Sequence, residues 1–522
     1  MALKNNGRLS RREMMQALSV CAAGGAAGLS PFLSGCREQA LTPEDKERWH
    51  TSARKDALGK PAKFLIVISA SGGASIIDSA MAIRQSECAT PNTLNVFPDG
   101  SVASIPNSPF RAVKYSAATL GAIPIPVNVD QTPFMTKHKD NILIASCTGT
   151  SVNHIIAQKR SCTGNGAWNN RTLQEAMALE YGADFPIPNV NMGSGGYLER
   201  GSDDSLPAYC YPEAVADAKL WPLGLDGARG IKGAPDKDLV AIARKLRNEK
   251  LDPESVFSQT FAKSDRLKRW VADRGMPQAR LEAMDLITRL NILPDSPPSI
   301  PLAEYGLAAA PEAAALRGVF PDFFVDPFEN QAAAAFLLIK HRVSCAITIG
   351  PNFNLLLFGS GASARLSNPP LAFDYSHNDH RGAQAMMWNR ILSVVDRLTT
   401  LLKGEMFDAA TGETLFDRTL IYIATDFGRT RQRVGGATTF GTGHDLNNGF
   451  FMMSPMLKGN TLLGGVNKNT CMTYGFDAET GVPDPTKVLS NERDIYAGVL
   501  RTLSVDTTGS GLPDAKAFRK VV

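Results

Sequence analysis

Histidine and aspartate residues gather in three short segments in the second half of the chain. The chain holds seven histidines, and three of them lie among aspartates in two of these segments. Imidazole nitrogens and carboxylate oxygens are typical ligands of zinc and manganese, at about 2.0 to 2.2 Å from the ion. Such residues, converging from separate loops, predict a site for a divalent metal ion, with zinc, manganese and calcium open as that ion. The expected ligands are Asp374, His377, Asp426 and His444.

Other residues in and near these segments are secondary candidates for the same site. An aspartate or histidine in a loop can also cap a turn or lie on the surface, so each of them has an ordinary structural alternative. The guanidinium group of Arg429 could clamp a bound phosphate or sulfate, or it could pair with Asp426 or Asp445 and fix its loop, which is the favoured role. The secondary candidates are Asp78, His154, His380, Arg429 and Asp445.

Buried strands and helices alternate along the chain and would position these segments. Short continuous apolar runs predict strands that are buried on both faces, and they cover residues 64–68, 141–146, 343–349, 419–424 and 450–457. Helical patterns cover residues 330–341, 383–402 and 494–503, and a further helix begins near His154. This alternation predicts an α/β protein with a doubly wound, largely parallel sheet and helices on both faces. In such a sheet, chemistry gathers at the carboxyl ends of the strands, where the candidate ligands would meet.

The N-terminus has the pattern of an export signal. Ser10 to Met15 contains Arg11 and Arg12 and resembles the twin-arginine consensus, and an apolar stretch follows it. That stretch is shorter than the about 20 residues that a membrane-spanning helix needs, so it favours a cleaved signal. We therefore expect residues 1–35 to be a signal peptide that the twin-arginine export machinery reads. The alternative is a cytosolic protein with a basic N-terminus.

Leu33 to Cys36 resembles a lipobox, in which cleavage before the cysteine leaves that residue to be acylated. Cys36 is thus the expected attachment point of a lipid anchor. The protein would then lie on the periplasmic side of the cell envelope, held to a membrane by lipid. Arg37, rather than aspartate, follows the cysteine and favours the outer membrane over the inner one.

The composition is that of an ordinary globular protein, with 43% hydrophobic and 20% charged residues. The formal net charge of +4 includes the basic leader, and no block of lysine and arginine follows it, so no nucleic-acid partner is expected. The expected organisation is a flexible tether over residues 36–60 and one large domain over 61–505. A surface insertion is expected near 190–235, and a C-terminal tail over 506–522.

Six cysteines follow Cys36, and none of their spacings is typical of a zinc ribbon or a CxxC pair. Cys147 and Cys162 could close a short loop as a disulfide in an oxidising compartment. They could equally be buried free thiols.

Several of these segments resemble one known family. Asp426 to Thr430 is similar to that family's acidic-Phe-Gly-Arg-Thr signature, and further likeness lies in Asp374 with His377, in Gly443 to Asp445 and in Arg493 to Leu500. On these residues the chain resembles the family known as domain of unknown function 1501. This family is typically carried behind twin-arginine signals and is placed in the alkaline-phosphatase-like superfamily. The resemblance covers roughly residues 61–505.

The resemblance implies a hydrolase of phosphate or sulfate esters. Superfamily enzymes of this kind use one or two metal ions, which activate a hydroxyl nucleophile and stabilise the attacked oxyanion. The nucleophile lies at a helix N-terminus, where free N–H groups help to hold an anion. Thr148, Thr150 and Ser151 precede the helix that begins near His154, and Ser151 is the expected nucleophile. Alternatively, these hydroxyls only cap the helix.

Two departures from the superfamily pattern leave a complete two-metal site in doubt. Ser69 and Ser71 stand where the phosphatases have an aspartate after the first strand, and Phe427 stands where they have a histidine. Asp78 and His380 could fill these gaps from an altered geometry. Three functions therefore remain open: a metal-dependent hydrolase, a catalytically silent domain that binds an anionic envelope component, and a structural or assembly lipoprotein.

Overall fold

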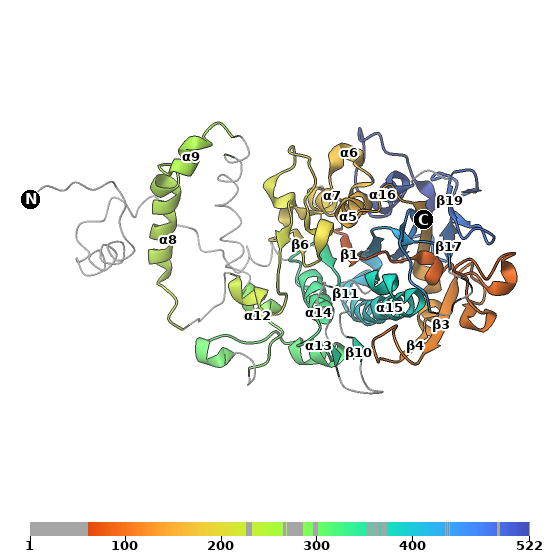
Figure 1. Ribbon diagram of the computed structural model, residues 1–522. Helices are drawn as coiled ribbons and strands as arrows, with labels where there is room; N and C mark the ends of the chain where they lie inside the picture. Colours follow the sequence, from red (N-terminus) through yellow and green to blue (C-terminus); the bar gives the residue numbers. More distant parts are fainter. Residues whose placement is uncertain are drawn as a thin grey trace, which may run out of the picture. The chain divides into compact units, whose positions relative to one another are not determined.

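The computed structural model describes most of the chain after residue 60 (Figure 1). All of the described residues fall within one unit of the chain, Trp49–Val522. The expected signal peptide, Cys36 and the tether over 36–60 lie outside the described residues. The structure describes residues 61–520 apart from 226–231, 265–267, 269–284, 296–300, 352–356, 359–364, 367–372, 434, 436, 438 and 488–490.

A central sheet of eight strands forms the middle layer of this part of the chain. Every neighbouring pair in the sheet is parallel except the two that involve β16, which is antiparallel to β13 and to β5. The prediction of an α/β protein with a mostly parallel sheet is thus confirmed. The strands, in sheet order, are β17 (Thr461–Leu463), β5 (Ile142–Thr148), β16 (Asn447–Met453), β13 (Thr419–Thr425), β1 (Phe64–Ala70), β8 (Ala346–Ile349), β6 (Asn189–Asn191) and β7 (Glu213–Ala214).

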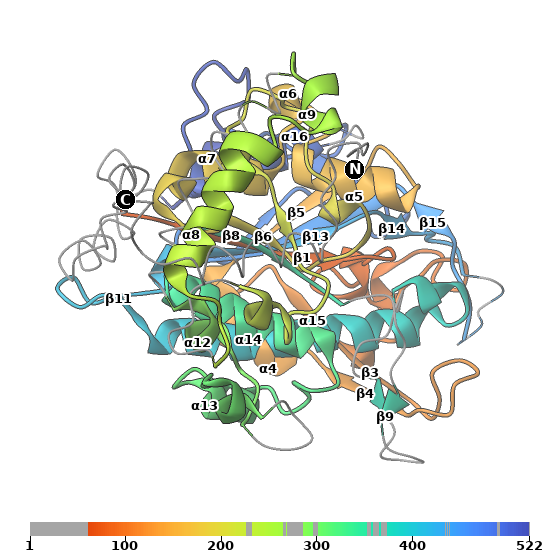
Figure 2. The ribbon, with the colours of Figure 1, turned by 90° about the vertical axis from the view of Figure 1, so that its left-hand side faces the viewer.

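Helices cover both faces of the sheet (Figure 2). One face carries α5 (His154–Thr163), α7 (Leu173–Tyr181) and α16 (Glu492–Thr502), and the other carries α4 (Thr132–His138), α14 (Pro327–Lys340) and α15 (His380–Gly404). Every residue of β1 and β13 is buried as a result. Burial on both faces explains why these strands are continuous apolar runs in the sequence. None of the helices in the described part of the chain is both long and apolar enough to cross a membrane.

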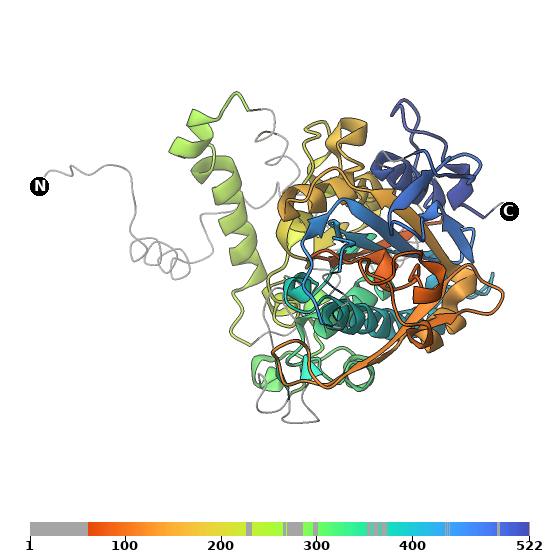
Figure 3. The ribbon, with the colours of Figure 1, turned by 45° about the vertical axis from the view of Figure 1, so that its right-hand side comes forward.

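The first strand lies among strands from the far end of the chain. β1 pairs with β13 on one side and with β8 on the other, and Figure 3 shows the red-orange part of the chain in the middle of the domain. Because β1 and β13 run parallel and in register from Phe64 opposite Thr419 to Ala70 opposite Thr425, their carboxyl ends meet at one edge. The segments that follow these two strands are therefore neighbours, although about 350 residues separate them.

Shorter elements surround the central sheet. The remaining helices are α6 (Ala167–Asn170), α8 (Lys237–Leu246), α9 (Val256–Thr260), α12 (Leu286–Leu290) and α13 (Ala313–Val319). Two small sheets have three strands: β2 (Val102–Ser104), β3 (Arg111–Ala117) and β4 (Val127–Asp130); and β18 (Gly465–Val466), β19 (Thr473–Phe476) and β20 (Pro483–Asp484). Three pairs complete the set: β9 (Leu357–Phe358) with β10 (Arg365–Leu366), β11 (Met406–Asp408) with β12 (Glu413–Thr414), and β14 (Gly428–Arg429) with β15 (His444–Asp445).

Two segments differ from the organisation expected from the sequence. The segment near 190–235 is not only a surface insertion, because β6 and β7 extend the central sheet at one edge. The tail over 506–522 packs on the domain: Phe518 is buried, with its ring centroid 5.8 Å from that of Phe476. Polar and glycine-rich composition hides both features in the sequence.

The six described cysteines are all buried. Cys162 is a free thiol, so the structure contains no bridge between it and Cys147. Burial raises the pKa of the Cys162 thiol to about 12, which keeps it protonated and unreactive at neutral pH.

Candidate metal centre

Asp426 follows β13 directly and joins the ends of β13 and β1. Its carboxylate is buried and accepts N–H groups of Gly72 (3.0 Å) and Gly73 (2.7 Å), which follow β1. Both glycines have positive φ, +98° and +79°. A Cβ at Gly72 would lie 2.8 Å from the amide nitrogen of Asp374. Glycine is therefore needed here both for the turn and for the close approach of the next loop.

His154 is the first residue of α5 and lies against Asp426. The helix is capped by Asn153, whose side chain accepts the N–H of Ile156. The Nδ1 atom of His154 is 2.7 Å from Oδ2 of Asp426, and Nε2 of Gln158 donates to the same oxygen at 3.3 Å. Asp426 thus orients the His154 ring from behind, and the Nε2 edge of that ring faces the other way.

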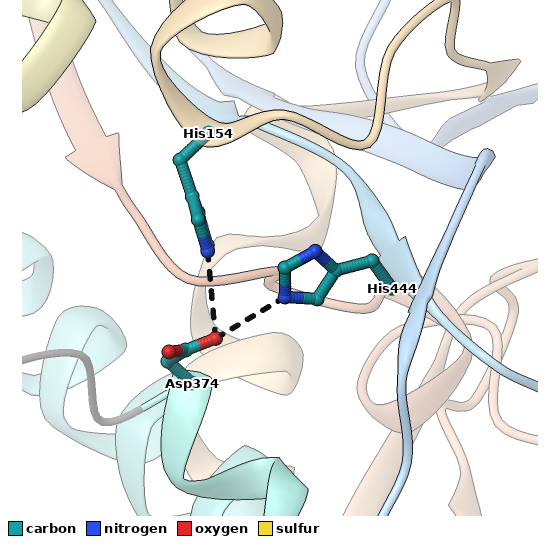
Figure 4. Close-up of side chains that lie close together, drawn as sticks. All are labelled: His154, Asp374 and His444. Carbon is teal, nitrogen blue, oxygen red and sulfur yellow. Dashed lines mark ion pairs between the residues drawn. The ribbon is translucent and has the colours of Figure 1, made fainter.

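Asp374 is the point on which three histidines converge, and Figure 4 shows two of them, His154 and His444. It begins the 3-10 helix Asp374–His377. Its Oδ1 atom lies 3.6 Å from Nε2 of His154, 3.5 Å from Nε2 of His444 and 3.3 Å from Nε2 of His377. In each case the imidazole presents its Nε2 atom to the same carboxylate oxygen.

His444 reaches this point from β15, which pairs with β14 so that His444 is opposite Arg429. Its Nδ1 atom donates to the carbonyl of Val152 at 3.0 Å, which leaves Nε2 as the acceptor nitrogen. The ring of Phe427 stacks on it, with centroids 4.2 Å apart. His444 is therefore held on two sides, with its lone pair toward Asp374.

His377 is the most exposed member of the group, with 44% of its side chain accessible. Its Nε2 atom is 3.1 Å from Nε2 of His444 and accepts an N–H of Arg429 at 3.2 Å. It closes the outer side of the cluster.

Arg429 is fully buried beneath the cluster and holds its loops together. Its guanidinium group donates to Oδ1 of Asp374 at 2.8 Å, to the carbonyl of Phe373 at 3.0 Å and to the carbonyl of Gly72. It also approaches the carbonyl of Thr442 at 3.5 Å. Of the two roles that the sequence leaves open for Arg429, these contacts support the structural one, but its carboxylate partner is Asp374 and not the expected Asp426 or Asp445.

The charges around the cluster shift the pKa values of its members in different directions. Burial acts to lower the pKa of His154, but hydrogen bonds to Asp374 and Asp426 outweigh it and raise the pKa to about 9. Burial acts to raise the pKa of Asp374, yet hydrogen bonds from His154 and Arg429 hold it well below its usual range. Burial lowers the pKa of His444, and nearby Arg429 and His154 add to this effect. The lowered pKa favours the neutral form of His444, which is the form that binds a metal, whereas the raised pKa of His154 means that an ion would have to displace its proton.

Three of these side chains have the spacing of ligands around one ion. One ligand atom from each of His154, Asp374 and His444 lies within 4.8 Å of the other two. Bonds of about 2.1 Å to a tetrahedral ion place its ligands about 3.4 Å apart. The distances of 3.5 and 3.6 Å from Asp374 to the two histidines agree with that geometry. Two of the three separations therefore match a tetrahedral ion, and the third is no longer than 4.8 Å.

Asp78 and His380 form a separate, fully buried pair behind the cluster. Oδ1 of Asp78 is 3.0 Å from Nε2 of His380, and Asn95 donates to the same oxygen at 2.9 Å. Nδ1 of His380 is 2.8 Å from the hydroxyl of Thr442. The network connects to the cluster through Thr442, whose N–H donates to the carbonyl of Ser376 at 2.8 Å.

Ser151 and Asp445 have local hydrogen bonds. The Ser151 hydroxyl accepts the N–H of Asn153 at 3.1 Å, and Asp445 accepts the N–H of Asn447 at 2.9 Å. Since Asn153 supplies the cap of α5, Ser151 is not the residue that caps this helix.

Sequence reasoning ranked His154 below Asp426 as a ligand and missed Gln158 and Thr442. His154 and Gln158 are four residues apart at the start of a helix and so share a face. That spacing is the signal that could have placed both of them against one carboxylate. Thr442 carries no comparable signal, because a threonine between two glycines does not indicate that its hydroxyl will face His380 or that its backbone will contact Ser376 and Arg429.

No family model matches the sequence, and no curated protein or solved structure matches it either. A function is therefore inferred from the residues of the site and from the family resemblance of the sequence.

Proposed function

We propose that this protein is a lipid-anchored, metal-dependent hydrolase of phosphate or sulfate esters that works on the periplasmic side of the envelope. The observation that carries the proposal is the convergence of His154, Asp374 and His444 to within 4.8 Å of one another. The ester class follows from the resemblance to the alkaline-phosphatase-like superfamily. The location follows from the export signal and from Cys36.

The hydrogen bonds behind the ligands favour metal binding over chance proximity. Metal-ligating histidines usually donate their other ring nitrogen to a carboxylate or a backbone carbonyl, which fixes the ring. The carboxylate of Asp426 lies against Nδ1 of His154, and the carbonyl of Val152 accepts the Nδ1–H of His444. We therefore assign Asp426 to orienting His154, in place of the direct metal contact expected from the sequence.

Three protein ligands would leave a fourth position, as in catalytic zinc sites. A divalent ion held by them would supply a Lewis acid and would lower the pKa of a water bound to it to about 7. His377 lies on the exposed side of the cluster, with Nε2 3.3 Å from Oδ1 of Asp374, and we assign it to accepting the proton of the attacking group. Phe427 excludes water from one side of His444 by stacking on its ring. Ser151 stays a candidate nucleophile.

The test is hydrolysis of an aryl phosphate and an aryl sulfate by the purified mature protein with zinc, manganese or calcium added. We expect turnover that a chelator removes, and loss of at least about a hundredfold in His444→Ala, since removing a ligand removes the Lewis acid. His341→Ala, which changes a histidine outside the cluster, is the matched control and should retain activity. Turnover that persists in His444→Ala and with chelator, or none with any metal, would contradict the proposal.

Ser151→Ala decides between the two possible attacking groups. If the Ser151 hydroxyl attacks the ester, the variant loses turnover while metal content stays unchanged. If water attacks, turnover remains near the level of the unaltered protein. Metal content is the control, because Ser151 makes its hydrogen bond to Asn153 and not to a ligand.

A further inference from the structure

Exposed apolar side chains gather beside the metal centre. Among the described residues, Val152, Ile155 and Ile156 leave 44 to 47% of their surface accessible, and Leu446 and Leu198 leave 38 and 37%. Single exposed apolar residues are common on proteins, but a contiguous group marks a binding surface. We call these five residues the apolar rim.

The members of the apolar rim are held together by the backbone. Ile155 and Ile156 lie in the first turn of α5, and Val152 comes just before Asn153, the residue that caps this helix. Leu198 ends the 3-10 helix Gly195–Leu198, which packs on α5: the N–H of Gly196 donates to Gln158 at 2.6 Å.

Leu446 joins the rim from the other side of the site. Its carbonyl accepts the N–H of Gly149 at 2.6 Å, which brings β15 and the loop before α5 together. The rim thus draws on the start of α5, on the 3-10 helix that packs against it and on the end of β15.

The rim and the metal ligands come from the same segments. His154 stands between Val152 and Ile155, and Leu446 is two residues after His444. The carbonyl of Val152 itself accepts the N–H of His444 at 3.0 Å. A molecule that reaches the ligands is therefore within reach of these apolar side chains.

Arg429, the buried arginine beneath the cluster, already has hydrogen-bond partners in the protein. Arg429 donates to Asp374 and to the carbonyls of Gly72 and Phe373, so its guanidinium group holds the loops in place of a substrate anion. Affinity for a substrate, beyond what the ion supplies, then has to come from other contacts. The rim offers apolar contacts of the kind that bind an alkyl chain or an aromatic ring.

We propose that the apolar rim binds the apolar alcohol part of the substrate, so that the substrate is an amphiphilic monoester with a long alkyl or aryl group. This inference rests on the proposed function, because the ester group is placed at the metal centre. Each methylene that is fully buried raises affinity about fourfold. Affinity should therefore increase with chain length.

The test is calorimetric titration of the metal-loaded mature protein with methyl-, butyl- and octylphosphonate, which are not hydrolysed. We expect octylphosphonate to bind at least about tenfold more tightly than methylphosphonate, since even partial burial of seven methylenes exceeds that gain. The double variant Ile155→Ser with Ile156→Ser should lose this gain and keep its affinity for methylphosphonate. Val482→Ser is the matched control, because Val482 is 60% exposed on a different segment.

The outcomes separate the inference from the proposed function. Equal affinity for methyl- and octylphosphonate would overturn the inference alone. Chain-length dependence that needs no metal, with no binding of methylphosphonate, would support the rim and contradict the proposed function. If no phosphonate binds, both fail. Binding of the protein to neutral lipid vesicles that the double variant loses, with octylphosphonate affinity unchanged, would assign the rim to a membrane surface and overturn the inference.

Discussion

At the scale of single residues, two aspartates of the site have different tasks. Asp374 faces three imidazoles, whereas Asp426 is enclosed by Gly72, Gly73 and His154. The distinction cannot be seen in the sequence, where both aspartates follow apolar strands or loops and look equally suited to bind a metal. It arises because the N–H groups of Gly72 and Gly73 donate to the carboxylate of Asp426, which follows β13.

This difference predicts unequal effects of two substitutions. Asp374→Asn should abolish metal binding, and Asp426→Asn should weaken it about 10- to 100-fold, the usual cost of losing the partner that orients a histidine ligand. Competition with a chromogenic chelator measures both affinities. Asp445→Asn is the control, since Asp445 accepts only a local N–H in the contacts described above. Equal loss in the Asp374 and Asp426 variants would show that Asp426 is itself a ligand.

Gly73 provides a second prediction at this scale. Gly73→Ala should lower the free energy of unfolding by more than about 1 kcal/mol, because an alanine at positive φ is strained. Its Cβ would also lie 2.5 Å from Nε of Arg429. Gly412→Ala, at a φ of +74° with open space around it, isolates the backbone part of this cost. Urea denaturation of the two variants compares them, and an equal loss would mean that the contact with Arg429 is unimportant.

At the scale of elements, α5 supplies His154 and is fixed by its N-cap. Asn153→Ala removes the side chain that accepts the Ile156 N–H, and should lower the free energy of unfolding by about 1 kcal/mol. Fraying of the first turn should also weaken metal binding. Thr172→Ala removes the corresponding cap of α7, away from the ligands, and should cost similar stability with no change in metal affinity. Equal metal affinity in both variants would show that the cap of α5 does not affect metal binding.

The ion pair between Arg111 of β3 and Glu87 predicts that the stability of the fold depends on pH. Hydrogen bonds from Arg111, against the effect of partial burial, hold the pKa of Glu87 well below its ordinary value of 4.5. A depressed pKa in the folded state stabilises the fold above the unfolded value, and this contribution is lost as pH falls. Glu87→Gln should thus be less stable than the unaltered protein at pH 7, and the difference should shrink steadily below about pH 4.5. Thermal melts across this range measure it; a difference independent of pH would contradict the assignment.

At the scale of the whole molecule, the burial pattern explains how much of the fold could be predicted. Strands buried on both faces need apolar residues at every position, so β1, β5 and β13 could be located closely from composition alone. The direction of β16 could not be predicted, because the same apolar run is compatible with a parallel and with an antiparallel strand. The short strands β6 and β7 escaped notice since two or three residues carry no periodicity.

The same limits apply to the site. Residues that follow β1 and β13 could be expected to meet, because the carboxyl ends of parallel strands share an edge. His154 and His444 depend instead on the start of α5, which the Asn153 side chain caps, and on the short β14–β15 pair, with the carbonyl of Val152 accepting the ring N–H of His444. These are local contacts, and the sequence does not show which distant carboxylate the two rings will face.

Anomalous X-ray diffraction from crystals grown with zinc would reveal whether His154, Asp374 and His444 bind one divalent ion. We expect one anomalous peak about 2.0 to 2.2 Å from Nε2 of both histidines and from a carboxylate oxygen of Asp374, with Asp426 still bonded to Nδ1 of His154. The peak should disappear in His444→Ala crystals of the same form. A crystal without a peak at this point, or with its strongest peak at the Asp78 and His380 pair, would overturn the proposed metal centre.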